Sequence, residues 1–80
     1  MFFKRLGSDP HANGAQSVGG DGCPDIWELE NGDFATIGID ITDVAIAKLP
    51  PTAGCGWDER IIRLPRNVLV NAKPDISELV

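Results

Sequence analysis

The sequence predicts a mainly β domain with a small helical part: a three- to four-stranded, mostly antiparallel sheet with one short helix, behind a flexible N-terminal arm. Residues 26–30 alternate between apolar and polar side chains and lead into an Asn-Gly pair, which is typical of tight hairpin turns. An apolar-rich segment follows at 34–41, and another alternating run lies at 58–64. Eighty residues allow one domain. Its core must be thin, because a chain of this size buries only roughly 60% of its unfolded surface.

Residues 1–22 are expected to form the flexible arm, and the β-rich domain is expected at residues 23–80. The segment 7–22 is rich in glycine and polar residues, and Val18 is its single large apolar residue. Such a stretch cannot offset the entropy lost on ordering. A small apolar cluster precedes it and could dock on the domain or on a partner; it consists of Phe2, Phe3 and Leu6.

The predicted hairpin admits two registers, and a shift of one residue exchanges the two faces of a strand. If the Asn-Gly pair alone forms the loop, the apolar side chains are split between both faces. A loop of residues 30–32, with Gly32 in a left-handed bulge, instead gathers six apolar residues on one face: Trp27, Leu29, Ala35, Ile37, Ile39 and Ile41. We prefer this register and expect that face to form the core. It leaves Ile26 and Phe34 on the opposite face, beside Thr36.

A short helix is expected after the hairpin, over residues 44–49, with Thr42 or Asp43 as its cap. Two prolines end it, because proline denies the preceding residue helical geometry. Residues 50–56 then form a loop, and we expect Trp57 to anchor this loop to the sheet.

The C-terminal third begins with the alternating run at 58–64, which predicts a further strand that Pro65 ends or places at an edge. Residues 68–70 fit either a short strand or a turn of helix started by that proline, and the helical turn is slightly favoured. Residues 75–78 have the spacing of a capping box, but so few residues follow that only one frayed turn or a loose tail is expected.

Charge limits the class of partner. The formal net charge is −5 and the pI is about 4.5, which gives a field that repels nucleic acid and anionic membrane surfaces. The seven Lys and Arg residues are scattered along the chain. The sequence has neither a long apolar window nor the apolar region of a signal peptide. We therefore expect a cytoplasmic protein without direct nucleic-acid or membrane binding.

Residues that could support catalysis or hold a metal are few. Cys23 and Cys55 are expected to be free thiols in the cytoplasm, and their spacing from the single histidine, His11, does not fit a zinc site. Glu28 and Glu30 could form an acid/base pair, but a solvated outer face explains them better because no His or Lys lies beside them. We therefore expect no catalytic residue, metal or cofactor.

Two kinds of binding site remain as hypotheses. The first is a protein-interaction surface, for a partner or a second copy, made from the aromatic residues Phe2, Phe3, Trp27, Phe34 and Trp57. The patch around Phe34 is either such a site or is covered by the short helix or by Phe2 and Phe3. The alternative is a small-ligand or anion site at Arg60, Arg63 and Arg66. A strand sends Arg60 and Arg63 to opposite faces, so protection of an edge strand explains these charges more simply.

Several segments together resemble small uncharacterised proteins of actinobacteria. They are the opening at 3–10, the Cys-Pro-Asp-Ile-Trp-Glu-Leu run at 23–29, the Gly-Asp-Phe run at 32–38 and the arginine-rich run at 60–66. The resemblance covers most of the chain, and none of these motifs is catalytic. It implies a bacterial cytoplasmic protein encoded near helix-turn-helix regulators and their small companion proteins. Residues 39–41 depart from the family, in which a more aromatic strand end is usual.

Overall fold

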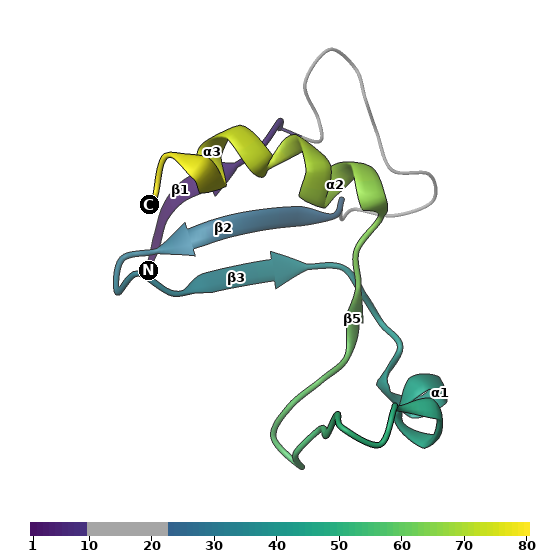
Figure 1. Cartoon of the computed structure of the whole chain (residues 1–80). Coiled ribbons are helices and arrows are strands. Elements are labelled where there is room, and N and C mark those ends of the chain that lie inside the picture. Colours follow the sequence, from purple (N-terminus) through teal and green to yellow (C-terminus); the bar gives the residue numbers. More distant parts are fainter. Residues whose placement is uncertain (10–22) are drawn as a thin grey trace.

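The computed structural model describes residues 1–9 and 23–80, and the predicted fold class is confirmed (Figure 1). The described residues form a three-stranded antiparallel sheet, a separate two-stranded sheet and short helices. In chain order the elements are β1 (Phe2–Leu6), β2 (Asp25–Leu29), β3 (Phe34–Ile37), β4 (Ile39–Asp40), α1 (Thr42–Ala45), the 3₁₀ turn η2 (Ile46–Lys48), β5 (Ile62–Arg63), α2 (Arg66–Asn71) and α3 (Lys73–Ser77).

The hairpin of β2 and β3 has the predicted bulged register. Leu29 N–H donates to the Asp33 carbonyl at 2.8 Å and Gly32 N–H donates to the Leu29 carbonyl at 3.0 Å. Gly32 has φ +93°, and Asn31 Oδ1 accepts the Asp33 N–H at 2.9 Å. The loop is therefore the three-residue loop of residues 30–32. The cross-strand pairs are Asp25 with Ile37, Ile26 with Thr36, Trp27 with Ala35, and Glu28 with Phe34.

The prediction of a flexible arm is wrong for residues 2–6, because they form strand β1 of the three-stranded sheet. It pairs antiparallel with β2, with Leu6 opposite Ile26 and a bulge near its start. Leu6 is only 3% exposed, so β1 supplies part of the core. The remainder of the expected arm, residues 10–22, lies outside the described residues.

The core lies on the sheet face opposite the predicted one. It consists of Leu6, Ile26 and Ala72, with Leu64 and Val68 packed against them. Helices α2 and α3 cover this face (Figure 1). The predicted core face is wrong because the sequence indicates only a turn of helix at 68–70 and a frayed turn or loose tail at 75–78. In the structure these segments overlap α2 and α3, which form the second layer. The helical reading of residues 68–70 is confirmed, since α2 begins directly after Pro65.

The strand predicted at 58–64 is short and pairs with β4 in the separate two-stranded sheet, where Ile39 lies opposite Arg63. This arrangement removes Ile39 from the predicted continuous apolar face. Gly38 joins β3 to β4, and a Cβ at this position would lie 2.6 Å from the Arg63 carbonyl oxygen. The glycine is therefore required by the close approach of the two segments.

The predicted short helix is present as α1 and η2, and it ends ahead of the prolines. The predicted cap is wrong: Asp40 Oδ1 accepts both the Thr42 N–H at 3.0 Å and the Thr42 hydroxyl at 2.6 Å. Trp57 is 96% exposed, so the prediction that it anchors the loop of residues 50–56 to the sheet is wrong. Across residues 1–9 and 23–80, the helices are all too short or too polar to span a membrane.

Candidate interaction surface

One face of the three-stranded sheet carries apolar side chains that none of the described helices covers. We call it the open face, and it consists of Phe2, Trp27, Leu29, Ala35 and Ile37. The strand register places these residues together on the face opposite Ile26. Helices α2 and α3 lie over the other face of the sheet (Figure 1). Phe2 is 57% and Ile37 51% exposed, whereas Trp27, Leu29 and Ala35 are half-buried.

Trp27 is held in place on the open face by a charged pair. Its Nε1–H donates to Asp25 Oδ2 at 2.9 Å, and the Arg5 guanidinium carbon lies 4.5 Å from its ring centroid. Arg5 Nε also donates to Asp25 Oδ2 at 3.0 Å. Asp25 is 6% exposed and additionally accepts the Ile26 N–H at 3.1 Å, so its charge is paired and its oxygens are occupied. Phe2 meets the Trp27 ring edge-on, with the centroids 5.8 Å apart.

The five aromatic residues of the predicted surface do not form one site. Phe2 and Trp27 lie together on the open face. Phe34 lies on the opposite face, where it pairs with Glu28. Phe3 is 67% exposed at the bulge of β1, and Trp57 belongs to the long loop between η2 and β5. Sequence alternation identified the two faces, but it could not show which of them the helices cover.

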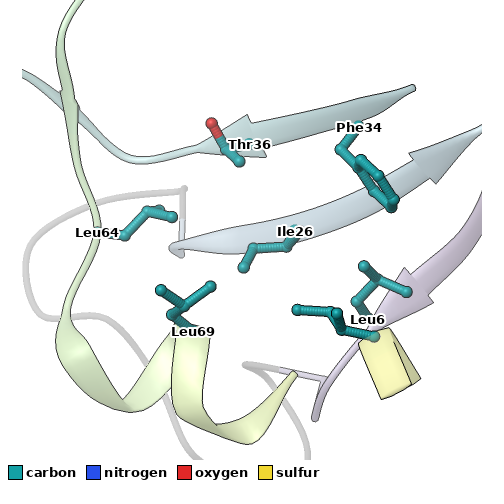
Figure 2. A pocket seen from close by; sticks show the side chains of 7 residues that line it. Leu6, Ile26, Phe34, Thr36, Leu64 and Leu69 are labelled. Atoms are coloured by element: carbon teal, nitrogen blue, oxygen red, sulfur yellow. The ribbon is translucent and has the colours of Figure 1, made fainter. Parts of the chain in front are cut away.

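A cavity of about 250 Å³ lies between the helix-side face of the sheet and the C-terminal helices. Figure 2 shows the labelled side chains converging on it from β1, β2, β3 and the α2 region. Phe34 and Leu69 at its wall are 50% and 55% exposed, so the cavity opens to solvent. Sequence reasoning missed it. The lining residues are Leu6, Ile26, Phe34, Thr36, Leu64, Leu69 and Ile76.

The arginines of the alternative anion site are dispersed, and one is already engaged. Arg60 Nε donates to Asp40 Oδ2 at 2.9 Å, while Arg63 belongs to β5 and Arg66 begins α2. Hydrogen bonds from Thr42 and then from Arg60 lower the pKa of Asp40 to about 2. The same contact raises the pKa of Arg60. The Arg60 charge is thus paired with a carboxylate of its own chain.

The side chains considered for catalysis or metal binding do not form a metal-binding group where the structure describes them. The described ranges contain no group of three or more His, Cys, Asp or Glu residues that could hold a metal. Cys23 is buried and Cys55 is half-buried, and the two do not form a disulfide with each other. Glu30 pairs with the N-terminal amine at 2.6 Å. His11 lies outside the described residues.

Similarity to known proteins offers no guide to the function. Models of known families, curated proteins and solved structures contain no match for this chain. The functional argument therefore depends on the open face, the cavity and the groups around them.

Proposed function

We propose that this chain is a non-enzymatic protein-interaction module, which binds a partner protein or a second copy of itself through the open face. The observation that carries the proposal is the row of exposed and half-buried apolar side chains on the sheet face opposite the one that packs against α2 and α3. A contiguous apolar patch rimmed by polar groups marks protein-binding sites in many proteins. Burial of this face would also add to a core that is thin in an 80-residue chain.

The chemistry of the open face suits protein recognition. Tryptophan and arginine are the residue types that most often dominate binding energy at protein interfaces. Trp27 is fixed by Asp25 and stacked on Arg5, so little side-chain entropy remains to be lost when a partner covers it. The Arg5–Asp25 pair is formed before binding and does not have to be assembled by the partner.

The same geometry gives less support to the alternative, a small-ligand or anion-binding domain. Arg60 is neutralised by Asp40 and lies 3.7 Å from a second carboxylate, that of Asp43. Arg63 and Arg66 belong to different elements. An anion would therefore have to displace an existing ion pair or bind to separate single charges.

The cellular setting is part of the proposal. The resemblance to small actinobacterial proteins remains a prediction, and it implies the bacterial cytoplasm as the location. Neighbouring helix-turn-helix regulators and their companion proteins are then the first partners to test. The net charge of −5 makes a protein surface a better partner than nucleic acid.

The test compares the full chain with two glutamate variants. Ile37→Glu places a charge on the open face, and Val44→Glu makes the matched change on α1, at a site that is 69% exposed. We expect light scattering after size exclusion, with co-purification from the native host, to show a dimer or a stoichiometric complex. Ile37→Glu should abolish it and Val44→Glu should retain it.

The proposal fails if the wild-type chain is monomeric without a stoichiometric partner, or if Ile37→Glu associates like the wild type. A monomer whose melting temperature rises with a metabolite or an anion would favour the small-ligand alternative.

A further inference from the structure

Among the described strands, β3 is an edge of the three-stranded sheet, and β2 is its single neighbour there. In an antiparallel pair, alternate residues direct their N–H and C=O groups towards the neighbouring strand. Leu29 and Asp33 form such a bonded pair at the hairpin end, so Ala35 and Ile37 also bond towards β2. Phe34 and Thr36 consequently direct their backbone donors and acceptors away from the sheet.

The cavity lies beside the same two residues. The side chains of Phe34 and Thr36 both line it, on the helix-side face (Figure 2). Helices α2 and α3 contribute Leu69 and Ile76 to the facing wall. Within residues 1–9 and 23–80, the open edge of β3 therefore borders an apolar cavity, and Phe34 and Thr36 belong to both features.

We propose that β3 accepts an extended segment of a partner protein as an additional strand, with an apolar side chain of that segment in the cavity. This inference rests on the proposed function, because both assume that the chain binds a partner protein. Main-chain hydrogen bonds to Phe34 and Thr36 supply affinity, and the cavity selects the side chain. Residues of the added strand opposite Phe34 and Thr36 place their side chains on the helix-side face, two positions apart.

The size of the cavity fits side chains. An apolar protein cavity of about 150 Å³ is large enough for benzene. At about 250 Å³, this one can take a phenylalanine or leucine side chain and part of a second. An apolar small molecule would leave the outward backbone groups of Phe34 and Thr36 to water, whereas an extended peptide bonds to them as well.

Charge favours a partner segment over a second copy. Asp33 precedes β3, and pairing of two β3 strands would set two chains of the same negative net charge against each other. Each copy carries a net charge of −5, so a neutral or basic segment approaches this edge at a lower electrostatic cost than a second copy does. The segment that fits is neutral or basic, with apolar residues at alternate positions.

The experiment selects binders from a library of random peptides on the immobilised full chain and measures the enriched peptides by fluorescence anisotropy and amide NMR shifts. We expect peptides with apolar residues two positions apart, and shifts centred on Phe34 and Thr36. Leu69→Glu should weaken binding at least about tenfold, because it places a charge at the cavity wall. Val70→Glu is the matched control: it is 57% exposed, next to Leu69 on α2, and outside the cavity lining.

N-methylation of the peptide separates strand addition from simple cavity filling. Methyl groups on the amides that face β3 should abolish binding, and methyl groups on the alternate amides should not. Equal binding of both methylated peptides would overturn the proposal, as would failure of the selection or equal effects of the two helix variants. A dimer that the peptide dissociates would show that a second copy occupies the edge, which also overturns it.

These results can be separated from a test of the open face. If Ile37→Glu loses the stoichiometric complex and the wild-type chain binds no peptide, the proposed function is retained and the β3 site is rejected. If the wild-type chain binds peptide and forms no complex through the open face, the β3 site is retained and the open face is rejected as the binding surface.

Discussion

Single residues decide where this chain turns, and some of them are visible in the sequence. Gly32 is predictable because an Asn-Gly pair between alternating segments is a strong hairpin signal, and its φ of +93° agrees with it. Asp40 is not predictable as the acceptor at the start of α1, because Thr42 and Asp43 are capping residues as well. The exposure of Trp57 was also not predictable, since an apolar side chain reveals nothing about what lies beside it.

Gly32→Ala should lower the free energy of unfolding by about 1 kcal/mol, because a residue with a Cβ is strained in the left-handed region. A Cβ at Gly32 would meet nothing within 4 Å, so the cost comes from the backbone alone. Gly54→Ala is the control, since Gly54 also has open space but does not have a left-handed φ. Denaturant unfolding measures both variants. Equal stabilities would contradict the bulged loop.

The pH dependence of stability should follow the ionisation of Asp40. Its pKa is lowered from 3.8 to about 2, so the ionised carboxylate stabilises the fold above about pH 4 and this contribution is lost as the pH falls through about 2. Asp40→Asn should therefore be less stable than the wild type at neutral pH, with the difference shrinking in acid. Carbon NMR titration of Asp40 measures the midpoint directly. A midpoint near 3.8 would show that the bonds from Thr42 and Arg60 are weak in solution.

At the scale of elements, alternation predicted the β2–β3 hairpin and its register, and the prolines predicted the limits of α1 and the start of α2. The partners of the later elements could not be predicted. The chain leaves the three-stranded sheet after β3, and β5 pairs with β4, passing so close to Gly38 that a side chain would not fit there. The docking of α3 depends on Gly7 N–H, which donates to Asp75 Oδ2 at 2.7 Å, 68 residues along the chain. A contact so distant in sequence leaves no local pattern.

Asp75→Ala should destabilise the fold by about 1.5 kcal/mol, because a backbone donor at the end of β1 loses a charged acceptor in a partly buried place. Ser77→Ala on the same helix is exposed and should change stability little. Hydrogen exchange of the Gly7 amide should accelerate in Asp75→Ala alone. If Gly7 exchanges equally fast in the wild type, α3 is not held to β1 by this bond.

For the whole molecule, composition and pattern predicted the mainly β class, but the core was assigned to the wrong face. The error has one physical origin. A sheet with apolar residues on both faces needs a second layer to show which face is inside, and that layer is built by α2 and α3, whose short apolar runs carry a weak periodic signal. The candidate site therefore differs from the predicted one. Trp27, which was expected in the core, lies on the open face, and Phe34 lines the cavity.

The sequence predicts a domain at residues 23–80, whereas the structure includes β1 in the sheet. Removal of β1 therefore tests which of these two boundaries is correct. A chain of residues 10–80 lacks Leu6 from the core and leaves the Asp25 carboxylate, 6% exposed, without Arg5. Each of these losses costs about 3–5 kcal/mol, against a total stability of about 4–12 kcal/mol for a domain of this size.

We therefore expect circular dichroism of the shortened chain to show no cooperative unfolding transition. A synthetic peptide of residues 1–9 added in trans should restore the transition, because it can pair with the vacated edge of β2. If the shortened chain unfolds cooperatively at the wild-type midpoint, β1 contributes nothing to stability and the boundary at residue 23 is the correct one.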